Sequence, residues 1–212
     1  MVSATCHRSV PVVKLARRFV LKRHSKVQSS FFAALLVAVL SHTAMVHATV
    51  VVALTRSELT LRSARVVRAT VGAQQSMWNE DHSQIVTLTT LRVTETWRGA
   101  PTTTLTLRQF GGVVGDIHSA IPGDGRLSPG QDVVLFLRER NGFVFLTALA
   151  QSVYYIDSSH GTPSVSRSLN ELSFAERGSD NVLRVDTREH TEAAEGLAAL
   201  RADVTRITRG AQ

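Results

Sequence analysis

The sequence predicts a mainly β fold, in which a small curled antiparallel sheet follows a short N-terminal helix and precedes a C-terminal amphipathic helix. Apolar and polar residues alternate in several segments between residues 65 and 156, which is typical of strands with one buried face. Turn residues such as Asn141-Gly142 separate these segments. A four-three apolar repeat near the C-terminus predicts the final helix.

Residues 1–48 have the features of an export signal that is removed from the mature protein. They contain seven basic residues and no acidic one, and the apolar run 31–40 matches the hydrophobic region of such a signal. The segment Val46-His47-Ala48 is typical of a cleavage site, so we expect the mature chain to start at Thr49. Arg17-Arg18 resembles a twin-arginine export signal, although a general secretory signal fits the same features.

An uncleaved membrane anchor is the alternative for this N-terminal segment. Apolar residues resume at Val50, so a helix over 31–53 would have the roughly 20 residues that spanning a bilayer requires. Ser41, His42 and Thr43 lie within it, and each polar group would need a partner in lipid. We therefore expect an exported protein, periplasmic or secreted, that meets the membrane only through its N-terminal signal or anchor.

The positive charge of the chain belongs to the same segment. The 24 Lys+Arg and 17 Asp+Glu residues give a net charge of +7, but residues 49–212 hold equal numbers of each sign. Nucleic-acid binding depends on cations that displace counterions from phosphates, so we expect no nucleic-acid partner. The single cysteine, Cys6, lies in the predicted signal, so the mature chain offers no thiolate for catalysis or metal binding. We expect no cofactor.

Local signals place the first helix and the strands of residues 49–160. Thr55 and Glu58 form a T-x-x-E capping box, which predicts a helix over about 56–65. The apolar phase of the segment 85–97 shifts at Thr89-Thr90, which predicts a bulge that helps the sheet to curl. Strands are predicted over 67–73, 85–97, 104–108, 133–137, 143–146 and 151–156.

Residues 161–212 form a C-terminal extension that we expect to pack on the same domain. Thr191 is a suitable N-cap and Gly210 lies beyond the expected end, so the helix should cover about 192–208. Its apolar stripe consists of Ala193, Leu197, Leu200, Val204 and Ile207.

About half of the chain resembles a family of uncharacterised exported bacterial domains. The segments that carry the resemblance are Arg65–Gly72, Val93–Gly99, Phe110–Gly115 and Ser128–Leu137. The resemblance implies a small OB-like β-barrel, similar in outline to netrin-like and metalloproteinase-inhibitor domains. Those inhibitors act through an N-terminal cysteine, which the predicted mature chain lacks, so the resemblance implies no activity here.

Few residues suggest catalysis. Asp116 and His118 are two residues apart and would share one face of a strand, where a carboxylate can orient an imidazole. The spacing matches no zinc motif, and neither a G-x-S-x-G elbow nor a lysine occurs after residue 48, so we assign no catalytic residue and no metal ligand. The glycines from Gly111 to Gly115 lack the dinucleotide-binding spacing and indicate a bulge or a close backbone approach.

Aromatic residues are the other candidates. Trp97, Tyr154 and Tyr155 lie on predicted strands and would form a ligand face if they were exposed, because OB-like barrels bind through aromatic faces. The sequence thus favours an exported, non-catalytic binding or interaction module for an unknown protein, peptide or glycan, with Asp116 and His118 as further candidate binding residues. A hydrolase or metal-dependent enzyme that uses Asp116 and His118 is one alternative, and a membrane-tethered domain is another.

Overall fold

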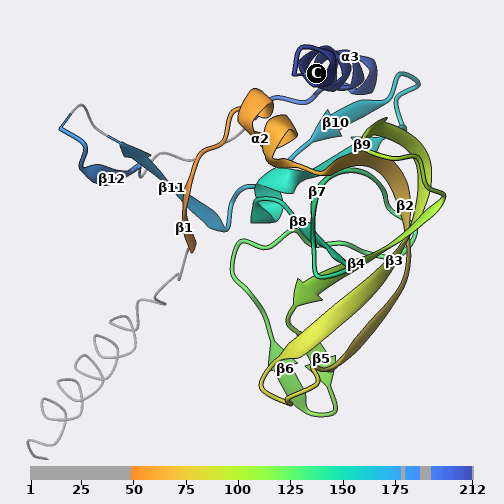
Figure 1. Cartoon of the computed structure of the whole chain (residues 1–212), viewed down its shortest axis with the longest axis vertical. Helices are drawn as coiled ribbons and strands as arrows, with labels where there is room; N and C mark the ends of the chain where they lie inside the picture. Colours follow the sequence, from red (N-terminus) through yellow and green to blue (C-terminus); the bar gives the residue numbers. More distant parts are fainter. Residues whose placement is uncertain (1–48, 178–179, 187–191, 212) are drawn as a thin grey trace, which may run out of the picture. The chain divides into compact units, whose positions relative to one another are not determined.

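The structure of the chain is a computed structural model that describes residues 49–177, 180–186 and 192–211 (Figure 1). The predicted export signal, 1–48, lies outside the described residues. The fold is mainly β, with a curled multi-stranded sheet and a C-terminal helix, as the sequence predicts. Among the described residues, no helix is both long and apolar enough to cross a membrane.

The short helix α2 (Arg56–Arg62) is confirmed together with its capping box. The Thr55 side chain accepts a hydrogen bond from the Glu58 backbone N–H, and the Glu58 carboxylate accepts one from the Thr55 N–H at 2.9 Å. These two bonds satisfy N–H groups that a helix start leaves without partners. The helix ends three residues earlier than predicted, because the chain is already extended at Ser63.

Five strands are linked in a partly closed ring. They are β2 (Arg65–Trp78), β3 (Ile85–Arg98), β4 (Thr104–Phe110), β7 (Asp132–Arg140) and β8 (Phe143–Leu146). Antiparallel pairs join β2 to β3, β3 to β4, β7 to β8 and β2 to β7. The parallel pairing of β4 with β8 rests on one residue pair, Leu107 with Val144, so the ring is least complete there.

The predicted irregularity in the second long strand lies where expected, but its extra residue belongs to the neighbouring strand. Val71 pairs with Leu91 and Gln74 pairs with Thr89, so two residues of β2 oppose the single residue Thr90. The inward phase of β3 does not shift between Thr89 and Leu91, because both residues are fully buried on the same face. The interruption of the apolar pattern at Thr89-Thr90 therefore marks a change from apolar to polar residues on the inner face of the ring.

The ring encloses one of two large apolar clusters. Its inner cluster is built from aliphatic residues of all five strands, including Val67, Leu91, Leu107 and Leu135. The second cluster lies on the other face of β2 and β7 and includes Val66, Trp97 and Phe136. The run Val133–Leu137 is buried throughout, which confirms that this strand is covered on both faces.

The sheet continues beyond β7 through three shorter strands. These are β9 (Val153–Asp157), β10 (Ser164–Ser166) and β13 (Glu195–Gly196), and a 3₁₀ turn over Leu149–Ser152 precedes β9. Helix α3 (Leu197–Arg209) follows directly, and its Leu197, Leu200 and Val204 are buried in the second cluster.

The C-terminal helix begins five residues later than the sequence predicts. Gly196 is its N-cap rather than an interior residue, and residues 195–196 pair with β10 as a strand. The expected cap, Thr191, lies outside the described residues. The later start arises because backbone pairing to β10 competes with the helix, and local sequence patterns do not contain that long-range contact.

Two small sheets complete the described chain. Strand β1 (Thr49–Val52) pairs in parallel with β11 (Leu172–Arg177), which pairs with β12 (Leu183–Asp186). Strands β5 (Gly112–Val114) and β6 (Ile117–Ser119) form a hairpin at the end of the ring opposite α3 (Figure 1).

Candidate functional site

The three aromatic residues expected to form one ligand face lie in different surroundings. Tyr154 is 2% exposed and packs on Phe136 with ring centroids 5.7 Å apart, so it belongs to the core. Tyr155 points to the other side of β9, where its hydroxyl donates to the Arg126 carbonyl at 2.8 Å. Neighbouring residues of a strand face opposite sides, so these two tyrosines do not share a face.

Trp97 lines a groove between α3 and strands β2 and β3. The groove has a volume of about 700 Å³ and includes Arg68, Glu95, Trp97, Pro163 and residues along α3. Trp97 is only 8% exposed, and its indole N–H donates to Glu95 at 3.0 Å. Most of the ring therefore packs in the core and is not available as a stacking platform.

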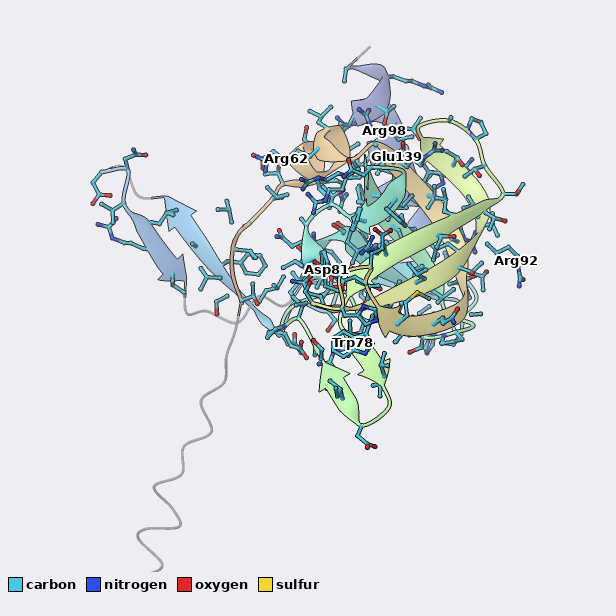
Figure 2. All side chains as sticks on the ribbon, turned by 60° about the horizontal axis from the view of Figure 1, so that its bottom comes forward. Arg62, Trp78, Asp81, Arg92, Arg98 and Glu139 are labelled. Atoms are coloured by element: carbon cyan, nitrogen blue, oxygen red, sulfur yellow. The ribbon has the colours of Figure 1, made fainter. Side chains whose placement is uncertain are left out.

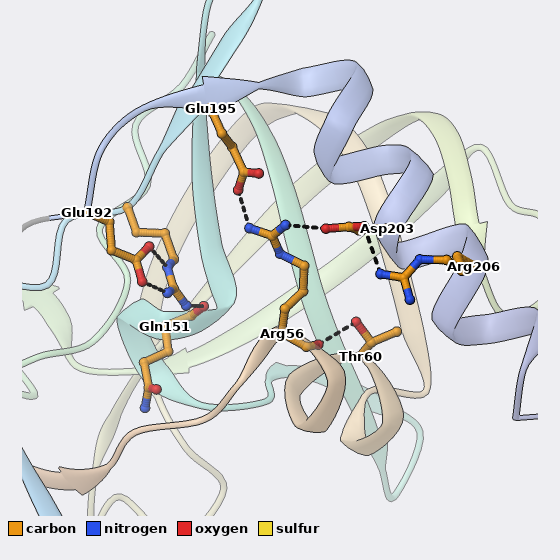
Figure 3. A network of polar contacts seen from close by, with 8 residues as sticks. Arg56, Thr60, Gln151, Glu192, Glu195, Asp203 and Arg206 are labelled. Atoms are coloured by element: carbon orange, nitrogen blue, oxygen red, sulfur yellow. Dashed lines mark hydrogen bonds and ion pairs between the residues drawn. The ribbon is translucent and has the colours of Figure 1, made fainter.

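A polar network holds α3 in place over this groove (Figure 3). The guanidinium of Arg56 on α2 donates to Asp203 on α3 at 2.6 Å and also pairs with Glu195 just before the helix. Asp203 in turn pairs with Arg206 at 2.9 Å. One arginine thus links the first helix to the last, and the position of α3 depends on it as well as on the buried leucines.

Three of the four arginines that line the groove form ion pairs with acidic residues in or next to it. Arg68 contacts Glu95 at 3.2 Å and Asp132 at 3.5 Å, and Arg201 contacts Glu95 at 3.2 Å. Burial opposes ionisation of Glu95, but hydrogen bonds from Trp97 and Arg68 outweigh it and lower the pKa of this carboxyl. Arg209 is the lining arginine that has no ion pair among the described residues, so most but not all of the positive charge of the groove is compensated.

The candidate acid–base residues are only partly brought together. Asp116 lies exposed in the β5–β6 turn, and His160 lies exposed in another loop, 3.6 Å from Asp157. His118 lines a cavity at the end of the ring together with Asp124, but no hydrogen bond joins these two side chains. The described residues contain no group of three or more His, Cys, Asp or Glu side chains placed to hold a metal ion.

A different surface combines exposed aromatic and basic side chains, and sequence analysis did not single it out. We call it the arginine–phenylalanine patch, and it comprises Arg108 and Phe110 of β4, Arg138 and Arg140 of β7, and Phe143 and Phe145 of β8. Its shallow hollow has a volume of about 260 Å³. Phe110 is 45% exposed and Phe143 is 38% exposed, although both are large apolar side chains.

Sheet register builds this patch. Asn141 and Gly142 both have positive φ angles, 52° and 76°, as the predicted tight hairpin turn requires. The turn places Arg138 opposite Phe145 and Arg140 opposite Phe143, so the four side chains share one face. The intervening Glu139 points to the other face and pairs with Arg65.

Two of the three arginines of the patch lie over aromatic rings, and none of the three pairs with an acid among the described residues. The Arg108 guanidinium lies 4.7 Å from the centre of the Phe143 ring, and that of Arg138 lies 5.8 Å from the Phe145 ring. No carboxylate lines the hollow, and none of its three arginines forms an ion pair within the described parts of the chain. Stacking on an aromatic face leaves the N–H groups of a guanidinium free to bind a carboxylate.

An apolar groove adjoins the patch at Phe110. It has a volume of about 440 Å³, and its lining includes Trp78, Phe110, Ile117 and Ile121. Trp78 lies at the end of β2, close to the β5–β6 hairpin (Figure 2). Phe110 belongs to both hollows, so the basic patch and the apolar groove form a continuous surface.

The sequence did contain a signal for the patch. The Asn141-Gly142 hairpin was recognised, and its register makes the residues at equal distances from the turn cross-strand neighbours. An Arg-x-Arg segment before the turn and a Phe-x-Phe segment after it therefore predict facing pairs. The contribution of Arg108 and Phe110 could not be predicted in this way, because β4 reaches β8 only through the parallel closure.

Comparison with known proteins adds no further constraint on the site, because the chain matches no protein-family model, no curated protein and no solved structure.

Proposed function

We propose that this protein is an exported, non-catalytic interaction module that binds an acidic segment of a partner protein through the arginine–phenylalanine patch. The observation that carries the proposal is the set of three arginines without ion pairs beside three phenylalanines, with no carboxylate in the hollow. Arginine and aromatic side chains dominate the binding energy of protein interfaces.

Charge and apolar surface together define the partner. Three uncompensated cations favour carboxylates, and the adjoining groove with Trp78 accommodates an apolar side chain. An acidic segment with an apolar anchor fits both features. A protein partner is favoured over a nucleic acid because residues 49–212 carry equal numbers of basic and acidic residues, without the general cationic excess that phosphate binding uses.

Two further features belong to the proposal. The ring order β2-β3-β4-β8-β7 supports an OB-like barrel, in which a meander of three strands is closed by a parallel pair. The signal-like residues 1–48 support export, and an uncleaved anchor would present the same module at a membrane surface.

The test measures binding of fluorescent peptides to the purified protein by anisotropy. A peptide of glutamate and leucine is compared with one of lysine and leucine, at low and high salt. The double variant Arg138→Ala/Arg140→Ala should weaken binding of the acidic peptide about 2- to 30-fold, since each exposed charge pair contributes about 0.2–1 kcal/mol. Salt should weaken binding as well.

The matched control removes two exposed arginines elsewhere, Arg62→Ala/Arg92→Ala (Figure 2). This control also accounts for attraction by the basic residues before Thr49, which both variants retain. Equal losses in the two variants, or equal binding of both peptides, would contradict the proposal. Tighter binding of a single-stranded oligonucleotide than of the acidic peptide would show that the partner class is wrong.

A further inference from the structure

A polar cavity lies at the end of the barrel that faces the β5–β6 hairpin. It has a volume of about 570 Å³, and its inner wall comes from the ends of β2, β3 and β4. The wall residues are Gln74 and Ser76 of β2, Thr87 of β3 and Gln109 of β4, with Asp124 from the following loop. They continue the inward face that is apolar further along the same strands.

The backbone is shaped to keep this cavity. Gly112 has a φ of 132°, and a Cβ atom built on it would collide with the Ser76 and Thr87 hydroxyl groups. The Thr87 hydroxyl donates to the Gly111 carbonyl at 2.7 Å, which brings the glycine segment against the polar wall. The close backbone approach predicted for these glycines is thus confirmed, and a larger residue at 112 would disturb the cavity.

The N–H donors of the two glutamines are already used inside the wall. The amide nitrogen of Gln74 donates to Thr89 and to the Leu127 carbonyl, both at 3.1 Å. That of Gln109 donates to Asp124 at 3.1 Å and to the Gly125 carbonyl at 2.8 Å. Carbonyl and carboxylate oxygens only accept hydrogen bonds, so these partners determine which way each amide is turned.

The polar groups of the wall that remain free to bind a ligand are therefore hydrogen-bond acceptors. The side-chain oxygens of Gln74 and Gln109 have no partner among the described residues, and Ser76 shares a bond of 2.9 Å with Thr87 that leaves lone pairs free. Asp124 accepts one N–H on each oxygen, from Gln109 and from the Gly125 backbone, and each oxygen can accept more.

Asp124 also lacks a positive partner. Its bonds come from neutral groups, and it forms no ion pair in the described parts of the chain. The arginine of the cavity wall, Arg126, pairs with Glu171, so this pair is neutral overall. His118 at the rim is exposed. Burial raises the pKa of the Asp124 carboxyl, as expected for a half-buried acid without a compensating charge.

We propose that this cavity binds an organic cation that carries several N–H donors, such as a primary ammonium or guanidinium group, with Asp124 as its counter-ion. The oxygens of Gln74, Gln109 and Ser76 accept the remaining donors. The inference is independent of the arginine–phenylalanine patch, which would bind a ligand of the opposite charge.

The test titrates the purified protein with butylammonium and butylguanidinium, followed by protein NMR chemical shifts. Tetramethylammonium carries the same charge without N–H donors, and butanol carries neither a charge nor an N–H donor. We expect one or both N–H cations to bind at least tenfold more tightly than these two controls. The stronger of the two then identifies the head group. Equal affinity of tetramethylammonium would overturn the proposal, and so would tighter binding of Mg²⁺ or Ca²⁺ at these residues.

Variants separate the cavity from other acidic surfaces. Asp124→Asn should reduce the affinity for the N–H cation at least tenfold, because it removes the counter-ion. Asp116→Asn removes an exposed acid of the neighbouring hairpin and should leave the affinity unchanged. Arg138→Ala/Arg140→Ala should also have no effect, which distinguishes failure of this proposal from failure of the proposed function. Equal losses for Asp124→Asn and Asp116→Asn would contradict it.

If Asp124→Asn fails to fold, the pH dependence of the wild-type protein provides the second measurement. Cation affinity should fall as the pH decreases through the raised pKa of Asp124. The other titratable groups of the wall are Glu171, which is paired with Arg126, and His118. A loss of cation affinity confined to neutral pH and above would contradict a role for the Asp124 carboxyl.

Discussion

Individual arginines differ in what surrounds them, and this difference separates structural from functional cations. Arg201 is exposed but lies 3.2 Å from Glu95, whereas Arg138 lies over the Phe145 ring. An exposed ion pair contributes only about 0.2–1 kcal/mol to stability, yet it neutralises the charge that a partner would meet. An aromatic ring carries no net charge and does not neutralise a guanidinium, so the positive charge of Arg138 can still attract a carboxylate.

Asp124 should make the pH dependence of stability unusual at the acidic end. Its folded-state pKa is raised above the ordinary value of 3.8, so the folded state holds this proton more tightly than the unfolded state does. Its contribution is therefore fully favourable below pH 3.8 and is lost as the pH rises through the raised value. Urea denaturation measures the unfolding free energy of the wild type and of Asp124→Asn. We expect the wild-type value to fall relative to that of the variant as the pH rises through this window. A difference that does not change with pH would contradict this.

Several other carboxyl groups have the opposite effect and provide the internal comparison. The backbone and side chain of Thr55 donate hydrogen bonds that lower the pKa of Glu58, and Ser83 does the same for Asp81. A lowered pKa stabilises the fold above the unfolded value, and this stabilisation is lost as the pH falls through the folded value. The protein as a whole should therefore lose stability in acid, even though the contribution of Asp124 to stability increases there.

Gly125 is the residue where added volume should be most harmful. A Cβ atom there would collide with Val153 and would lie 2.9 Å from a Leu146 methyl carbon, both in the inner core. We expect Gly125→Ala to destabilise the fold by about 1–3 kcal/mol, as overpacking does. Thermal unfolding checks this, with Gly210→Ala as the control, since its φ is -72° and a Cβ there would meet only ordinary contacts at 3.6 and 3.8 Å. Similar losses at both positions would mean that crowding against Val153 and Leu146 is not responsible.

At the level of elements, α2 and α3 depend on different interactions. Helix α2 is only seven residues long and combines its cap with one fully buried leucine, Leu59, whereas α3 has three buried apolar side chains and no side-chain cap. Isolated helices of this length are marginal in water, so both need their tertiary contacts.

Removal of the cap tests α2. Thr55→Ala deletes the hydrogen bond to the Glu58 N–H and should cost about 0.5–2 kcal/mol of unfolding free energy. Ser57→Ala, at an exposed position inside the same helix, should be neutral or slightly stabilising because alanine favours helices. If the two variants have the same stability, the capping box makes no contribution.

Removal of a core side chain tests the attachment of α3. Leu200 is fully buried against the second cluster, so Leu200→Ala should cost about 2–5 kcal/mol. Leu61, which is 47% exposed on α2, provides a matched substitution that should cost far less. Denaturant titration measures both changes. A small loss at Leu200 would show that α3 is held mainly by the Arg56 network.

At the level of the whole molecule, the main question is which residues the working protein retains. The residues of β1 that pair with β11, Thr49–Val52, all follow the expected cleavage site. The expected cleavage would therefore leave these four residue pairs in place.

Thiol labelling of the exported protein tests this expectation directly. Cys6 is the only cysteine in the chain, so protein that has lost residues 1–48 should not react with a thiol reagent even when it is unfolded. Intact-mass analysis should give a chain that starts near Thr49. A labelled product that retains Cys6 would contradict cleavage and favour the membrane-tethered alternative.

The parts of the fold that depend on local patterns were predicted correctly. The capping box at Thr55 and the hairpin at Asn141-Gly142 involve residues within a few positions of each other, and both are confirmed. The buried central strand 133–137 was also predicted, because its apolar run has no polar face. The predicted start of α3 was wrong because the actual start depends on pairing with β10, some 30 residues away in the sequence.

The sequence by itself determined the mainly β class, the main strands and both helices, since periodicity, turns and caps are local properties of the chain. The tertiary structure alone decided which side chains meet between strands that no tight turn connects. It placed Tyr154 in the core, joined Arg108 of β4 to the β7–β8 hairpin, and gathered Gln74, Gln109 and Asp124 around one cavity. Both proposed sites depend on closure of the ring, a long-range pairing that no local pattern specifies.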